Sequence, residues 1–371
     1  MSAQRPIVFH ILYRFDVGGL ERVIANCINE FPQEDYRHVI IALTEACDFV
    51  QHIKADIEII SLNKKPGLDW SIYKKMWLLF NKYKPQVCHS YNFSSLEFQF
   101  IAFLNLCPRR IHAEHGRDID DPQGLNRKRN IFRKVMSFFT HRFIAVSADL
   151  ETWLIDKVDI SANKVRLIYN GIDTNQFNFT SIPADLHDLE TMFVIGTVAR
   201  LTTIKDQKTL VHAFKQAVTN SDNGVNLRLL MVGDGPCMEQ LQQLSEKLNI
   251  SEQVIFTGAR ADVNELLSLM SVFVLPSLSE GTPMCVLEAM ACKTPIVASN
   301  VGGLPELIVE GTNGILAPVG NVEQFAQAIS FYENHPEELL KQGEFARNLV
   351  LEKFSQHSMA QQYLEEYKGV S

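Results

Sequence analysis

Short apolar runs alternate with amphipathic segments along the whole chain. The runs are Ile7–Tyr13, His38–Leu43, Val87–His89, Phe143–Val146, Phe193–Val198, Leu227–Val232, Val254–Phe256, Val272–Leu275 and Ile296–Ala298. Runs that are apolar throughout are typical of parallel strands covered on both faces. Segments between them have helical spacing, as in Leu20, Val23, Ile24, Cys27 and Phe31. Strands alternating with helices predict an α/β fold with right-handed crossovers.

The alternation starts again in the second half of the chain. Residues 7–31 and 193–219 both have the pattern strand, loop, helix, while residues 174–191 are polar and without a clear period. We therefore predict two Rossmann-like domains joined by a linker, and a final helix that could pack on either domain. The predicted domains are residues 1–172 and 192–353. The linker is 173–191, and the final helix lies in 354–371. Open α/β sheets bind ligands at the carboxyl ends of their strands, so two facing domains would form a ligand cleft.

Composition favours a globular protein of a reducing compartment. The 371 residues are 46% hydrophobic and 21% charged, and no stretch approaches the ~18 apolar residues of a membrane span. The run Ile7–Tyr13 is too short for a signal-peptide core. Seven cysteines without a C-x-x-C pair favour free thiols in the cytoplasm over a disulfide frame or a zinc site.

Charge is distributed unevenly. The net charge of −8 is the sum of +4 in residues 1–172 and −12 in the remainder. The basic half is expected to face an anionic partner. The alternative is a chance difference between two solvated surfaces. Residues 124–142 carry apolar and aromatic residues and no acid, and their cations are Arg127, Lys128, Arg129, Arg133, Lys134 and Arg142. This segment predicts a contact with an anionic membrane surface, or else a helix with a solvated basic face. Nucleic acid is not an expected partner of this acidic chain.

The segment 276–290 is the strongest candidate for chemistry. Thr282 is a favourable N-cap and Pro283 suits a first helical position, so a loop with Glu280 and Gly281 is expected to open a helix that carries Glu288. Free N–H groups at a helix start form an anion site, and glycine lets a ligand approach the backbone.

A glycosidase is the first alternative for these two acids. Glycosidase carboxyls lie roughly 5–9.5 Å apart. The helix from Pro283 to Glu288 alone rises about 7–8 Å, and Glu280 lies further back. The acids are therefore expected to hold different parts of one ligand, such as the hydroxyls of a ribose. The alternative for Glu288 is a solvated helix residue.

Further candidates follow other predicted strands. Arg200 and Lys205 could neutralise a diphosphate and stabilise it as a leaving group, or else be two surface cations. Gly233 belongs to a turn, and Arg260 follows the next strand. In the first half, Gly18 and Gly19 follow a strand but lack the third glycine of a dinucleotide motif, and His115 follows the strand Arg110–Ala113; a lone histidine is usually structural.

The spacing Glu280-x7-Glu288 within S-E-G-T-P-M-C-V-L-E-A-M-A resembles the signature of retaining glycosyltransferase family 4. The elements R-L-x-x-x-K at 200–205, G-G-x-E at 18–21 and H-G at 115–116 agree with it, and the resemblance covers almost the whole chain. That family has the GT-B architecture of two facing Rossmann-like domains. The chain departs from the family at Asp206, where glycine is common.

The resemblance implies a role for each candidate. Glu280 would approach the donor sugar, and Glu288 would bind the nucleotide ribose. The residues expected against the sugar, phosphates and base are Gly18, Gly19, Gly233, Arg260, Gly281, Thr282, Pro283 and Met284. The residues expected at the reacting centre are His115, Arg200, Lys205 and Glu280.

The implied reaction is transfer of a sugar from a UDP- or GDP-type donor to a glycan or lipid-linked acceptor, with retained anomeric configuration and without metal or cofactor. The sequence at residues 13–19 and 115–118 resembles that of sugar transferases from bacterial exopolysaccharide clusters, including those linked to PEP-CTERM systems. The expected location is the cytoplasm, at the inner face of the plasma membrane. A sugar-nucleotide epimerase and a non-catalytic nucleotide-sugar-binding module are the alternatives.

Overall fold

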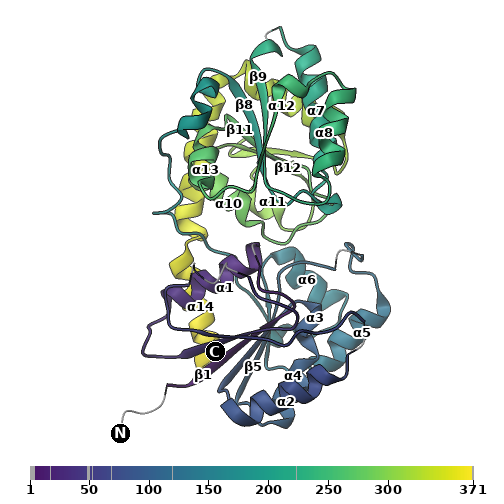
Figure 1. Ribbon diagram of the computed structural model, residues 1–371, viewed down its shortest axis with the longest axis vertical. Helices are drawn as coiled ribbons and strands as arrows, with labels where there is room; N and C mark the ends of the chain where they lie inside the picture. Colours follow the sequence, from purple (N-terminus) through teal and green to yellow (C-terminus); the bar gives the residue numbers. More distant parts are fainter. Residues whose placement is uncertain are drawn as a thin grey trace. The chain divides into compact units, whose positions relative to one another are not determined.

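The computed structural model describes residues 5–16, 18–47, 51, 53–67, 69–118, 120–222 and 224–369. The chain divides into two compact units (Figure 1), one formed by Met1–Gly171 with Gln356–Ser371 and the other by Ile172–Ser355. Each unit is a parallel sheet with helices, which confirms the predicted α/β fold class. No helix in the described part of the chain is long and apolar enough to cross a bilayer.

The first unit contains a seven-stranded parallel sheet in the order β3-β2-β1-β4-β5-β6-β7. The strands are β1 (Ile7–Leu12), β2 (Arg37–Ala42), β3 (Glu58–Ser61), β4 (Val87–Tyr91), β5 (Arg109–Glu114), β6 (Arg142–Ala145) and β7 (Val165–Leu167). Successive strands are added first on one side of β1 and then, from β4 on, on its other side. The topological switch point of this sheet therefore lies between β1 and β4.

Seven α-helices lie in the described part of the first unit. They are α1 (Gly19–Glu30), α2 (Ser71–Tyr83), α3 (Phe93–Leu96), α4 (Phe98–Leu104), α5 (Arg127–Met136), α6 (Ala148–Asp156) and α14 (Gln356–Lys368). The last helix packs against α1. Its fully buried Glu366 forms ion pairs with Arg109, Arg142 and Arg166 at 2.6, 3.1 and 2.8 Å. These contacts explain why the last helix belongs to the first unit.

The second unit contains a six-stranded parallel sheet in the order β10-β9-β8-β11-β12-β13. The strands are β8 (Phe193–Val198), β9 (Leu227–Val232), β10 (Val254–Gly258), β11 (Val272–Leu275), β12 (Ile296–Ser299) and β13 (Gly314–Ala317). Its switch point lies between β8 and β11. The helices are α7 (Gln207–Asn220), α8 (Met238–Lys247), α9 (Val263–Leu269), α10 (Met284–Ala291), α11 (Leu304–Leu307), α12 (Val322–Asn334) and α13 (Pro336–Lys353).

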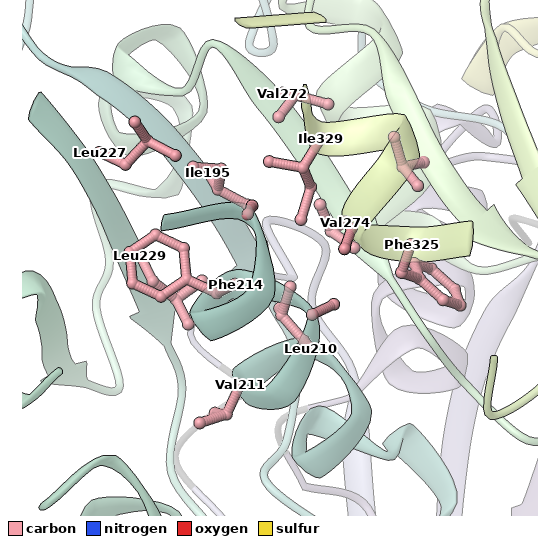
Figure 2. Close-up of a cluster of buried hydrophobic side chains, with 14 of the residues drawn as sticks. Ile195, Leu210, Val211, Phe214, Leu227, Leu229, Val272, Val274, Phe325 and Ile329 are labelled. Carbon is pink, nitrogen blue, oxygen red and sulfur yellow. The ribbon is translucent and has the colours of Figure 1, made fainter. Parts of the chain in front are cut away.

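Helices α7 and α12 bury one face of the second sheet (Figure 2). Leu210, Val211 and Phe214 of α7 recur at helical spacing and pack on strand residues such as Ile195 and Val274, all of them fully buried. Burying each such side chain contributes roughly 1.5–3 kcal/mol. This apolar layer fixes β8 beside β11 and so places the loops that follow them.

A buried polar network lies where α14 covers the first sheet. His10 contacts His38 at 3.0 Å and the Tyr91 hydroxyl at 2.9 Å, and Tyr367 of α14 contacts His89 at 2.8 Å. Burial lowers the pKa of His38 to about 4, with a further contribution from Arg5. Burial and neighbouring histidines also hold the pKa of His10 and His89 well below the ordinary value. All three rings are therefore neutral in the folded protein near pH 7.

We expect the free energy of unfolding to fall as the pH drops below about 6.5. The unfolded chain then binds protons that the buried rings cannot, so stability is highest above the unfolded pKa and decreases toward the folded one. His38 alone would cost about 2 kcal/mol at pH 5. Urea denaturation between pH 5 and 7.5 measures this. His38→Gln should flatten the dependence and His187→Gln, an exposed control, should not; an unchanged slope in His38→Gln would contradict this explanation.

Candidate functional site

The loops that follow β8 and β11 meet at the switch point of the second sheet. The first loop carries Arg200 and Lys205, and the second carries Glu280. The two loops are joined by a hydrogen bond from the Leu278 N–H to the Ile204 carbonyl oxygen (2.8 Å). Loops that diverge at a switch point leave room for a ligand at the carboxyl ends of the strands.

Lys205 and Glu280 form a close ion pair at this point. The Lys205 Nζ lies 2.5 Å from the Glu280 Oε1, and the side chains are 22% and 9% exposed. Burial would lower the pKa of Lys205, but attraction to Glu280 outweighs it and leaves the pKa above the ordinary lysine value. The site therefore holds a permanent ammonium group, while Arg200 stands exposed earlier in the same loop.

Asp206, the departure from the family pattern, has a structural explanation. Its backbone is left-handed (φ 46°), a conformation that glycine adopts most easily and that aspartate tolerates. Its carboxylate accepts a hydrogen bond from the Thr209 hydroxyl (2.6 Å) in the first turn of α7. The extra negative charge is thus partly satisfied by the helix that it precedes.

Helix α10 begins at Met284, one residue later than predicted. Pro283 is extended (φ −71°, ψ 121°) and takes the N-cap position, without a side-chain cap, so the expectation that Thr282 caps the helix is wrong. Glu288 is 6% exposed, because nearly every residue of this short helix is buried. The alternative of a solvated Glu288 is therefore wrong too, and a buried carboxylate requires polar partners.

Two glycines pack closely against the backbone of the loops that carry Glu280 and Arg200. Gly302 follows β12 with a φ of +57°, and a Cβ there would lie 1.9 Å from the Glu280 carbonyl oxygen. Gly233 follows β9 with a φ of +129°, and a Cβ there would lie 2.1 Å from the Ala199 carbonyl oxygen, next to Arg200. Sequence reasoning missed Gly302, although a Gly-Gly pair directly after a strand was the same signal that selected Gly18 and Gly19.

If the Glu280 loop is at the reacting centre, as the sequence predicts, Gly302→Ala is expected to lower kcat by about 100-fold, because a displacement of about 1 Å there has that effect. The added methyl group cannot fit beside Glu280 without moving its backbone. Gly311→Ala is the matched control: its φ is +69°, but nothing lies within 4 Å of the added carbon. Steady-state kinetics and a melting curve of both variants measure the effect, and equal kcat values in the two would refute it.

Arg260 is held by two carboxylates. Its guanidinium pairs with Asp185 at 2.7 Å and with Asp262 at 2.5 Å. Arg260 follows β10 in the second sheet, and a contact of its peptide group with a base stays a prediction. Stacking of the guanidinium on a base would require these ion pairs to break. The structure therefore favours the backbone for any role of Arg260.

Gly18 and Gly19 follow β1 at the switch point of the first sheet. Gly18 is extended (φ −171°) at the N-cap of α1, and its carbonyl oxygen accepts a hydrogen bond from the Arg22 N–H (3.1 Å). Val17, which precedes them, lies outside the described residues. The helix start is thus directly adjacent to the position at which a ligand of this sheet would bind.

His115 follows β5 of the first sheet with its backbone fixed. Its N–H donates to the Asn92 Oδ1 (2.8 Å), and the Asn92 N–H donates to the Ala113 carbonyl oxygen (2.8 Å). Burial lowers the pKa of His115 to about 4, so the ring is neutral at pH 7. Its buried Nε2 has no hydrogen-bond partner within the described ranges, as expected of a group that serves a ligand. Sequence reasoning missed Asn92, whose only signal was a polar residue directly after a buried strand.

Arg133 holds the loop of His115 from both ends. Its Nε lies 2.7 Å from the Glu114 Oε1, and its Nη2 lies 3.2 Å from the Asp118 Oδ2. Arg133 and Glu114 are almost completely buried. Burial would raise the pKa of Glu114, but the guanidinium lowers it to about 2. Arg133, expected on a basic surface, is instead a buried positioning residue.

Comparison with known proteins agrees with this geometry. The family described as "Glycosyltransferase Family 4" matches residues 17–176, and the family "Glycosyl transferases group 1" matches residues 192–333. The chain belongs to glycosyltransferase family 4. The His115 loop lies within the first of these matches, and the Lys205–Glu280 pair lies within the second.

Curated relatives differ in how much of their length is matched. N-acetyl-alpha-D-glucosaminyl L-malate synthase of Bacillus anthracis is 33% identical over 57% of this chain and 55% of its own length. The chain thus spans about half the length of that relative. The capsular polysaccharide biosynthesis glycosyltransferase CapM of Staphylococcus aureus is 26% identical over 92% of this chain and 94% of its own.

A solved structure confirms the fold class. HepE of Anabaena, solved in complex with UDP and glucose, has a TM-score of 0.83 with 21% sequence identity, over 99% of this chain and 100% of HepE. The family 4 chain therefore has the GT-B fold that the sequence predicted.

Proposed function

We propose that this family 4 protein is a retaining glycosyltransferase that uses a UDP- or GDP-sugar. Its acceptor would be a glycan or a polyprenyl-linked glycan in bacterial exopolysaccharide or cell-surface polysaccharide synthesis. The observation that carries the proposal is the Lys205–Glu280 ion pair at the switch point of the second sheet. The polysaccharide role of CapM and the UDP bound to HepE support it.

The donor would be held by the second unit. The buried Glu288 would accept hydrogen bonds from the ribose, and the start of α10 with the backbone of residues 281–284 would face the diphosphate. Lys205 and the exposed Arg200 would neutralise its charge. Gly18 and Gly19 at the start of α1 would bind phosphate groups of a donor.

The chemistry would be a front-face substitution. The bond from the anomeric carbon to the phosphate oxygen breaks, the acceptor oxygen bonds to the same face, and the acceptor proton passes to the departing phosphate. Lys205 and Arg200 stabilise the negative charge that develops on that phosphate, which makes a bridging metal ion unnecessary. Glu280 is already paired with a lysine and would orient the sugar rather than attack it. The neutral His115 would hydrogen-bond to a sugar hydroxyl.

The reaction is proposed to take place in the cytoplasm without a cofactor. The seven cysteines occur as free thiols, which suits a reducing compartment. A nucleic-acid partner is not proposed, because the chain is acidic.

Product analysis tests the proposal. The full-length protein is incubated in EDTA with UDP- or GDP-sugars and polyprenyl-linked acceptors, and the anomeric proton of the product is observed by NMR. We expect transfer only with acceptor, and an α-linked product from an α-linked donor. Conversion of the donor without acceptor would indicate an epimerase, and binding without turnover a non-catalytic module; either result overturns the proposal.

A further inference from the structure

Exposed apolar side chains gather on three helices of the first unit. Helix α2 packs against α4, and Phe139, just after α5, contacts Phe100 and Phe103 of α4 with ring centroids 4.8 and 5.2 Å apart. Figure 1 shows these helices along one side of the unit. We call their outer surface the α2–α4–α5 face. Its exposed apolar members include Trp77, Leu78, Leu104, Leu106, Ile131 and Phe138.

These side chains are additional to those that form the core. Helix α2 already buries Met76 and Phe80, and α4 already buries Phe98 and Ile101. On and after α5, residues 127, 131, 135 and 138 recur every three or four positions, which places them in one stripe. Exposed apolar groups gathered in this way mark an interaction site.

The α2–α4–α5 face is also positively charged. Residues 70–96, 98–113 and 122–148 contain no Asp or Glu. Lys74, Arg127 and Lys128 are exposed and have no ion-pair partner among the described residues. Glu97, the acid between the first two stretches, accepts a hydrogen bond from the Tyr73 hydroxyl (2.8 Å). The partner of this face must therefore be apolar in part and negatively charged.

The segment 124–142 alone does not provide such a surface. Arg133 is buried, and the other paired cations are Arg129 with Asp120, Lys134 with Asp159 and Arg142 with Glu366. Only two of the six cations expected to face a membrane, Arg127 and Lys128, are left exposed without ion-pair partners in the part of the chain that the structure describes. The positive charge and apolar area of α2 and α4 are needed to complete the surface.

We infer that the α2–α4–α5 face binds the surface of an anionic lipid bilayer. Its aromatic and aliphatic side chains would enter the boundary between headgroups and acyl chains, and its lysines and arginines would meet the anionic headgroups. A second copy of the chain is a poorer occupant, because two basic faces repel each other. The face belongs to the first unit and the Lys205–Glu280 pair to the second, so each is tested by its own measurement.

Vesicle flotation of the full-length protein tests this inference. We expect binding to phosphatidylcholine vesicles that contain phosphatidylglycerol, weaker binding at high salt, and little binding to phosphatidylcholine alone. Each cation near such a surface contributes about a fivefold factor, so K74Q/R127Q/K128Q should lower the partition coefficient about 100-fold. I131S/F138S should lower it at least about tenfold, because two buried apolar side chains are lost.

Matched controls come from the second unit. Val225 and Leu340 are both 78% exposed, and V225S/L340S should bind vesicles as the wild type does. No binding by the wild type, or equal binding by all variants, would overturn the inference. Self-association that is lost in I131S/F138S would also overturn it by assigning the face to a second copy. Nucleotide-induced thermal shifts of every variant should equal that of the wild type, which separates this test from that of the donor site.

Discussion

Replacing Lys205 by alanine is expected to lower kcat by about 10²–10³-fold, because preorganised charge at a developing anion is worth that much. The ammonium group lies 2.5 Å from Glu280, so the variant removes the cation and leaves a nearly buried carboxylate without it. Binding of the nucleotide should weaken less than turnover. Steady-state kinetics with a fixed donor and acceptor measure both.

The control for this variant is Lys208→Ala. Lys208 is exposed on α7, three residues beyond Lys205, and should leave kcat unchanged. A Lys205→Ala enzyme with wild-type kcat would show that the departing group is stabilised elsewhere. A large rise in KM with an unchanged kcat would assign Lys205 to ground-state binding instead.

Arg133→Met is expected to reduce the free energy of unfolding by about 3–5 kcal/mol, since it leaves a buried charge without its partner. Glu114 is fully buried and its ionised form depends on the guanidinium. Urea denaturation at pH 7 measures the loss. The double variant Arg133→Met with Glu114→Gln should recover much of it, because the uncompensated charge is removed.

Arg127→Met provides the comparison within the same helix. Arg127 is exposed, so its replacement should change stability by no more than about 0.5 kcal/mol. Equal effects of the two substitutions would contradict the buried positioning role of Arg133.

Much of the fold follows from local pattern. The bounds of β8 and β9 equal the predicted runs, because strands covered on both faces are mostly apolar. Strand β3 escaped prediction because Glu58–Ser61 is a half-exposed edge strand without a continuous apolar run. The packing of α14 on the first unit could not be predicted either, since Glu366 pairs with arginines that are 257, 224 and 200 residues away in the chain.

In the candidate site, too, the sequence predicted residues but not the contacts that depend on the fold. Motif spacing selected Lys205 and Glu280, but their contact depends on β8 lying beside β11, which is a property of the sheet and not of either segment. Gly302 and Asn92 act through single contacts with the backbone of a neighbouring loop. Such contacts leave no periodic trace in a sequence. Arg133 was assigned to a surface because charge counts do not distinguish a buried arginine from a solvated one.

The most direct test of the central claim is isothermal titration of the full-length protein with UDP, GDP, ADP and CMP in EDTA. A ligand at 100 times its dissociation constant also stabilises the fold by roughly 2.7 kcal/mol, so a melting curve gives an independent reading. We predict that UDP or GDP binds the wild type, that Glu288→Ala loses this binding, and that Glu323→Ala, a first-turn acid of α12, retains it. Absence of binding by any nucleotide, or equal binding by both variants, would contradict a donor site at α10.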